Sequence, residues 1–292
     1  MHFQDTTALE MFVDYQRAQN LAATTIRNRR SILTTFARKT GMLVDCDVFT
    51  LRRYIGRDED VSAGTRRTER GALIAFYTFL HEEGLRADNP SAKLPVVRVP
   101  KGVPRPFSAE QIDAMIGGGA YAKTRAMILL GYYQGFRVSS IARVHGHDID
   151  RAGATIATVV KGGKERRLPL HEVIAELSLA MPPDGYWFPA RDGSGGHIRP
   201  SSVTDLITKA KKRAGIVDPK LTPHSLRHAF GSDLVEQGVD IRVVQELLVH
   251  EHLSTTQIYT QVSDRRKQEG IRALAPRTVP ARSGRGAAKL AA

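Results

Sequence analysis

The chain has 292 residues, a length typical of two domains, and its 43 Lys and Arg against 30 Asp and Glu give a net charge of +13. Its single cysteine, Cys46, argues against a secreted disulfide scaffold, and its short apolar runs argue against a membrane span, so we expect a cytoplasmic protein. The positive charge favours a polyanionic partner such as nucleic acid or, less often, an anionic membrane surface.

Helices are the first predicted elements and fill residues 6–83, where no strand pattern appears. Apolar residues recur at helical spacing in residues 24–39 and most clearly in residues 64–83, which Gly84 is well suited to end. Thr50 is predicted to cap a short helix between them. Arginines on these helices could hold phosphates or could form a solvated face, and this segment alone leaves both interpretations open. They are Arg27, Arg30, Arg66, Arg67 and Arg70.

A proline-rich segment separates these helices from the rest of the chain. Residues 89–106 contain five prolines and no helical period, which predicts an extended linker and a domain boundary. We therefore expect a helical domain in residues 1–95 and a linker in residues 96–107. Ser108 and Gln111 then have the spacing of a capping box, which predicts that a helix begins after Ser108.

The pattern changes between residues 148 and 171. There, β-branched residues in ATIATVV, turn residues in KGGK and a second run, ERRLPL, predict a β-hairpin with Lys161 at its tip. Helical spacing returns after residue 200. The predicted fold class is mainly α, or α+β: a helical domain followed by a mostly helical domain with a small antiparallel sheet, in residues 108–275. Residues 276–292 have little to bury, which predicts a basic, disordered tail.

His224, Arg227 and Tyr259 are candidates for a chemical role, although each alone favours a structural one. Pro223 is typical of a first helical position, so His224 and Arg227 lie three residues apart on one helix face. Such a pair usually lies on a surface, and an isolated tyrosine is usually a packing residue. The residues found with them in the sequence change this interpretation.

Six residues in these surroundings match the pattern of a known family. The segments are GFRVSSIARV, VVKGGKERRLPL, HSLRH and LLVHEHLSTTQIYT, and the residues are Arg137, Lys161, His224, Arg227, His250 and Tyr259. With them the chain resembles the tyrosine recombinase, or phage integrase, family over nearly its whole length. There are two departures: Ser140 and Ile141 stand where the family usually has Glu and Leu, and Val249 stands where it usually has Gly.

The resemblance implies a helical core-DNA-binding domain of the SAM-like kind in residues 1–95 and a catalytic domain in residues 108–275. It implies that Tyr259 attacks a DNA phosphodiester and forms a 3′-phosphotyrosyl bond, without metal, nucleotide or other cofactor. Arg137 and Arg227 can each hold the non-bridging phosphate oxygens with two hydrogen bonds, and so stabilise the charge that a metal stabilises in other enzymes.

The other three members of the set have roles that come from the resemblance. His224 assists transfer of the tyrosine proton, Lys161 protonates the leaving 5′-hydroxyl, and His250 orients the phosphate by hydrogen bonding. His145 and His147 are close in sequence, but no further ligands complete a metal-binding pattern, so no metal site is predicted.

The resemblance also implies a site-specific recombinase that acts on double-stranded DNA as four protomers on two duplexes. A phage or mobile-element integrase is the first interpretation, and a Xer-like recombinase that resolves chromosome or plasmid dimers is the second. A topoisomerase-like enzyme with the same chemistry and a catalytically idle DNA-binding protein with the same fold are further alternatives. We expect no arm-binding domain, no membrane partner, nucleoid association when DNA is bound, and a DNA-bending host factor or directionality factor as a candidate partner.

Overall fold

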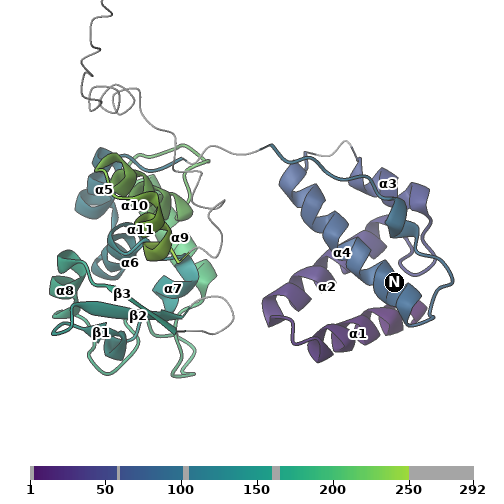
Figure 1. Cartoon of the computed structure of the whole chain (residues 1–292), viewed down its shortest axis with the longest axis horizontal. Helices are drawn as coiled ribbons and strands as arrows, with labels where there is room; N and C mark the ends of the chain where they lie inside the picture. The colour runs from purple at the N-terminus through teal and green to yellow at the C-terminus, as the bar shows by residue number, and fades with distance from the viewer. Residues whose placement is uncertain (1–2, 58–59, 101–104, 160–164, 250–292) are drawn as a thin grey trace, which may run out of the picture. The chain divides into compact units, whose positions relative to one another are not determined.

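A computed structural model describes residues 3–57, 60–100, 105–159 and 165–249 (Figure 1). The chain forms two compact units, and the division between them falls after Gly102. The prediction of a mainly helical chain with a small antiparallel sheet is confirmed. Within the described residues, no helix combines the length and the apolar character that a bilayer crossing requires.

Four α-helices and a short 3₁₀ turn make up the described part of the first unit. They are α1 (Phe3–Ala18), α2 (Ala23–Thr40), α3 (Val48–Ile55), α4 (Ala63–Glu82) and η1 (Pro90–Lys93). The Ser62 side chain accepts a hydrogen bond from the Thr65 amide at the start of α4, and Gly84 follows its end at a φ of +68°. The prediction that Thr50 caps α3 is wrong. Asp47 does so instead and accepts from the Thr50 amide, because the helix begins two residues before Thr50.

The core of the first unit lies between α1, α2 and α4. Leu33 and Phe36 of α2 are fully buried with Leu73 and Phe76 of α4. Each such side chain contributes about 1.5–3 kcal/mol when it leaves water. The hydroxyl of Tyr77 donates to a backbone carbonyl at 2.6 Å, so its polar end is satisfied within this core. With their apolar faces buried together, α2 and α4 present their polar faces outward.

The second unit contains seven α-helices within its described part, together with a π-helical and a 3₁₀ turn. They are α5 (Ala109–Ala114), η2 (Met115–Gly119), α6 (Ala122–Tyr133), α7 (Val138–Arg143), η3 (Gly146–Asp148), α8 (Glu172–Ser178), α9 (Pro200–Arg213), α10 (His224–Glu236) and α11 (Ile241–Leu247). The predicted capping box is confirmed: Ser108 accepts from the Gln111 amide, and the Gln111 side chain accepts from the Ser108 amide.

The sheet of the second unit has three antiparallel strands in the order β1 (Ile149–Asp150), β2 (Thr155–Val159) and β3 (Glu165–Pro169). The predicted hairpin is confirmed in its pairing, with Ile156 opposite Leu168. The strand β1 was not predicted, because two residues are too few to display an alternating pattern. Lys161, at the predicted tip, lies outside the described residues.

Helix α6 lies at the centre of the second unit and packs on α8, α9 and α10 (Figure 1). Its Met127, Ile128 and Leu130 are buried. A Cβ atom at Gly131 would lie only 3.0 Å from a methyl group of Leu226, so the absence of a side chain lets α6 and α10 approach closely. This packing brings the turn after α6 against the first turns of α10.

Candidate active site

Arg137, His224 and Arg227 come together in the second unit. Arg137 is the N-cap residue of α7, just beyond the end of α6, and the other two residues lie in the first turns of α10. The charges of both arginines act on the His224 imidazole, so both guanidiniums lie within electrostatic reach of that ring. The other three predicted catalytic residues lie outside the described residues: Lys161, His250 and Tyr259.

The Arg227 side chain is almost completely buried, with 3% of its residue surface exposed. Its Nη1 donates to the carbonyl oxygen of Gly135, and its Nη2 donates to the carbonyl oxygen of Leu248. Gly135 precedes Arg137 by two residues, and Leu248 precedes His250 by two. One guanidinium therefore joins the backbone segments that lead to two other predicted catalytic residues.

The backbone conformation and the close packing at position 135 both require glycine. Its φ is +59°, and a Cβ atom there would lie 2.7 Å from the Phe230 ring and 3.1 Å from the Leu248 side chain. A side chain at this position would push the turn away from α10 and its carbonyl away from Arg227. The sequence analysis did not identify Gly135 or Leu248, and the only available signal was the glycine in the segment GFR.

His224 is exposed at the start of α10, and its ring meets the His228 ring edge to face at 4.7 Å. Its pKa is lowered to about 4, first by the neighbouring protein atoms that desolvate the imidazole and then by the charges of His228, Arg227 and Arg137. The pKa of His228 is also lowered, by burial and by the charge of Arg227. His224 is therefore neutral near pH 7 and can accept a proton.

No group of three or more His, Cys, Asp or Glu side chains with metal-binding geometry occurs among the described residues. The His-Gly-His segment has local structural partners instead. His145 Nδ1 accepts from the His147 amide, and the His147 ring pairs with Asp184 at 3.0 Å. The site contains two guanidiniums and a neutral imidazole. The guanidiniums can stabilise an anion whose negative charge increases during a reaction, and the imidazole can accept a proton from a neighbouring group.

The five predicted DNA-binding arginines have different surroundings in the first unit. Arg27 and Arg67 are exposed, and Arg30 forms a half-exposed ion pair with Glu10. Arg66 donates to the carbonyls of Val61 and Arg57, at 3.2 and 2.7 Å. Arg70 donates to the carbonyl of Leu94 at 2.9 Å. The guanidiniums of Arg66 and Arg70 therefore hold the backbone of their own unit.

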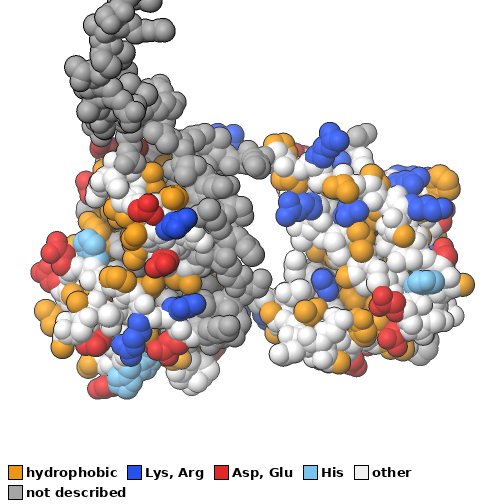
Figure 2. Space-filling view, in the orientation of Figure 1, with side chains coloured by type: hydrophobic (Ala, Val, Ile, Leu, Met, Phe, Trp, Pro, Cys, Tyr) orange, Lys and Arg blue, Asp and Glu red, His pale blue; other side chains and the backbone are white. Residues whose placement is uncertain are grey.

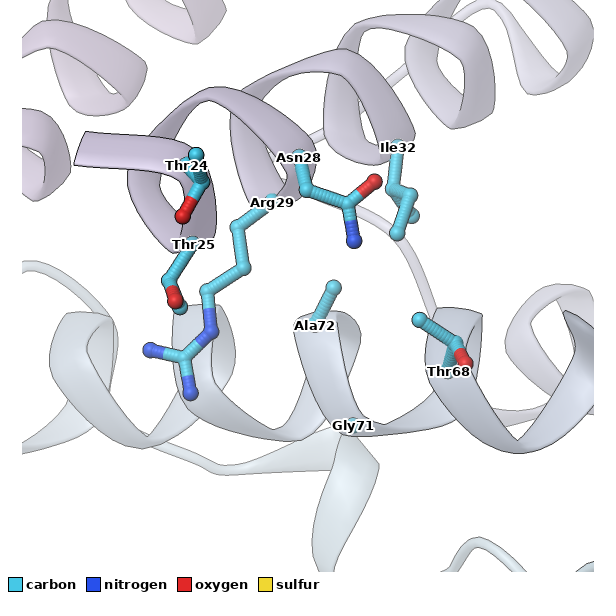
Figure 3. A pocket seen from close by; sticks show the side chains of 8 residues that line it. All are labelled: Thr24, Thr25, Asn28, Arg29, Ile32, Thr68, Gly71 and Ala72. Atoms are coloured by element: carbon cyan, nitrogen blue, oxygen red, sulfur yellow. The ribbon is translucent and has the colours of Figure 1, made fainter. Parts of the chain in front are cut away.

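A groove of about 550 Å³ lies between α2 and α4 (Figure 3). Asn28 and Arg29 point into it from α2, and Thr68 and Ala72 point into it from α4. A Cβ atom at Gly71 would meet no atom within 4 Å, so the glycine leaves the groove open there. In Figure 2, Lys and Arg side chains gather on the upper part of the face of this unit that is in view, and few lie on its lower part. The sequence analysis did not identify the uncharged residues that line this groove, such as Asn28 and Thr68, because it selected candidate DNA-binding residues by their positive charge.

Comparison with known proteins adds independent information. The model of the phage integrase family matches residues 107–266. The tyrosine recombinase XerD of Rhizobium meliloti is 31% identical over 284 residues, which span 88% of this chain and 91% of that protein. The integrase of mycobacterium phage Brujita is 38% identical and covers 91% of this chain and 92% of its own, with a TM-score of 0.49. A lambda integrase dimer bound to a COC' core site has a TM-score of 0.71 at 17% identity, over 86% of this chain and 96% of that one.

Proposed function

We propose, since the chain belongs to the phage integrase family of tyrosine recombinases, that it is a site-specific recombinase that cuts and rejoins DNA through Tyr259. The observation that carries the proposal is the hydrogen bond from Arg227 to the Gly135 carbonyl, two residues before Arg137, with both guanidiniums acting on the His224 imidazole. These are the groups that a metal-free attack on a phosphodiester requires: two cations for the phosphate and an acceptor for the proton. Recombination activity is the shared property of the named relatives, whereas the role of each residue is our proposal.

In the proposed reaction, the Tyr259 oxygen forms a bond to the scissile phosphorus and the bond from phosphorus to the 5′ oxygen breaks. Arg137 and Arg227 stabilise the charge on the non-bridging oxygens, and His224 takes the tyrosine proton. Lys161 gives a proton to the leaving 5′ oxygen, and His250 donates a hydrogen bond to the phosphate. A positioned proton donor or acceptor contributes about 10²–10⁴-fold to such a rate.

The covalent product explains how exchange can proceed without an energy source. The phosphodiester is replaced by a phosphotyrosyl ester of similar energy, so a 5′-hydroxyl from another strand can reverse the step. Duplex DNA is the proposed partner, as in the lambda integrase complex with a core site. We retain the proposal of four protomers on two duplexes and of accessory DNA-bending or directionality factors.

The proposal is tested by trapping the covalent product. Labelled duplexes that cover the DNA on either side of the gene are nicked, so that the released oligonucleotide diffuses away after cleavage. We expect a protein–DNA complex that survives boiling in detergent and that forms equally well in excess EDTA, because guanidiniums stabilise the phosphate charge. Failure to trap any complex would favour a catalytically idle DNA-binding protein. Cleavage that requires magnesium would instead indicate a nuclease.

The biological role has two candidates that share this chemistry. We propose a phage or mobile-element integrase first, supported by Ser140 and Val249, which depart from the usual family pattern, and by the basic residues 276–292. The second candidate is a Xer-like recombinase, supported by the similarity to XerD over most of both chains. An attachment-like repeat beside the gene would favour the integrase, and a single chromosomal site near the replication terminus would favour the Xer-like role.

We further propose that the first unit contacts the duplex through the groove between α2 and α4. The exposed Arg27 and Arg67 would neutralise phosphates, and Asn28 and Thr68 are the groove side chains that could read base edges. Arg66 and Arg70 would act indirectly, because their guanidiniums hold backbone carbonyls. The five predicted DNA-binding arginines would then differ in function.

Arg67→Ala and Arg70→Ala test this division, since the two arginines lie three residues apart on α4. Arg67→Ala is expected to weaken binding to all sequences and to lower the slope of log affinity against log salt by about 0.9, the value for one lost phosphate contact. Arg70→Ala is expected to leave that slope nearly unchanged and to lower the thermal midpoint of the first unit, because the Leu94 carbonyl loses its donor. Equal changes in slope for both variants would contradict the division.

A further inference from the structure

Val249 has a backbone conformation that valine rarely adopts. It follows Leu248, the C-cap residue of α11, and its φ is +47°. The position after a helix C-cap is commonly left-handed, and where it is, usually glycine or sometimes asparagine occupies it. A β-branched residue is an outlier in this region, because its Cβ substituents crowd the backbone. The end of α11 is nevertheless closed, since the Val249 amide donates to the Glu246 carbonyl at 2.9 Å.

Packing and a hydrogen bond hold this turn in its strained form. Leu248 is completely buried, and it packs with Val244 and Phe230 in a small apolar cluster. Its carbonyl accepts the hydrogen bond from Arg227 Nη2. Strained backbone persists only where its surroundings determine it in this way, and such positions tend to occur at functional sites.

The turn is placed to control Arg227 in the proposed active site. The Leu248 carbonyl fixes one end of the Arg227 guanidinium, and the Gly135 carbonyl fixes the other. A rotation of the backbone at Val249 would therefore move one acceptor of Arg227.

We propose that Val249 is a positioning residue, whose strained conformation limits how often the turn holds Arg227 in the arrangement needed for DNA cleavage. The proposal rests on the function proposed above and adds a property of the same site. A valine in this conformation lowers the ratio of the ordered to the disordered turn, relative to glycine, on the order of tenfold. Bound DNA would then be cleaved only in those complexes whose turn is ordered, so the strain lowers the cleavage rate and leaves binding unchanged.

Substitutions that separate backbone conformation from side-chain size test the proposal. Val249→Gly and Val249→Asn accept a left-handed conformation readily, so both are expected to speed single-turnover cleavage of nicked DNA at saturating protein, up to about tenfold. Val249→Ala removes both methyl groups but keeps the Cβ atom, so its gain is expected to be smaller. DNA affinity should change less than twofold in all three variants, because only the positioning of bound phosphate changes.

A thermal unfolding measurement on the same variants gives a readout that does not depend on activity. The glycine and asparagine variants are expected to raise the thermal midpoint above that of the alanine variant. If they do so without faster cleavage, the turn is strained but does not position the site, and the proposal is wrong. Equal losses of cleavage in the glycine and alanine variants would show that the valine side chain matters instead of the backbone. If the unaltered protein forms no covalent complex at all, it is the proposed function that fails.

Discussion

Tyr259→Phe is expected to abolish covalent joining to DNA while DNA affinity stays within about twofold, since only the nucleophilic oxygen is removed. A phenyl ring has no group that can attack phosphorus, and none of the other proposed roles supplies a second nucleophile. The measurement is the detergent-stable complex on nicked duplex, with a gel-shift titration of the same protein for affinity.

Tyr121→Phe is the matched control. Tyr121 belongs to the same unit and is exposed, with 75% of its residue surface accessible, and its ring lies 4.9 Å from the Arg213 guanidinium carbon. Loss of its hydroxyl should leave covalent joining at the level of the unaltered protein. A detergent-stable complex formed by Tyr259→Phe at the same level would show that another group is the nucleophile, and the assignment of Tyr259 would have to be abandoned.

The sequence predicted well those features that depend on local patterns. The β2–β3 pairing follows from two β-branched or alternating runs around a turn, and the Ser108 capping box follows from a three-residue spacing. The nearness of Arg137, His224 and Arg227 could be predicted only through the family resemblance, because the first two are 87 positions apart in the sequence. No periodic pattern carries information over that distance.

The contacts of the arginines could not be predicted, for a physical reason. A sequence shows which side chains a helix face presents, but every residue has a backbone carbonyl, so no residue type marks the acceptor of an arginine. Arg67 and Arg70 are equivalent in the sequence, and yet one is exposed and the other bonds the Leu94 carbonyl. The strain at Val249 shows the opposite case. At Val249 the sequence already showed a departure from the family glycine. The structure adds that the residue has a φ of +47°, a conformation that favours glycine.

Arg227→Ala is expected to lose both stability and cleavage, because its guanidinium has two functions. Its removal leaves the carbonyls of Gly135 and Leu248 without this donor in a buried place, at a cost of about 1–3 kcal/mol for each group. Removal of one charge-stabilising group from a transition state costs about 10²–10³ in rate. Chemical denaturation of the second unit and single-turnover cleavage of nicked DNA measure the two losses separately.

Two further variants, Arg137→Ala and Arg227→Lys, separate the loss of stability from the loss of cleavage. Arg137 is only half-buried, so its removal should slow cleavage as much as Arg227→Ala does, with a clearly smaller loss of stability. Lysine at position 227 keeps the charge, but one ammonium group cannot reproduce a planar fork that serves two carbonyls and a phosphate together. Arg227→Lys should therefore remain defective in cleavage while recovering part of the stability. If Arg227→Ala were as stable as the unaltered protein, the two carbonyl bonds would have no structural importance, and the effect of Arg227 would come from the phosphate alone.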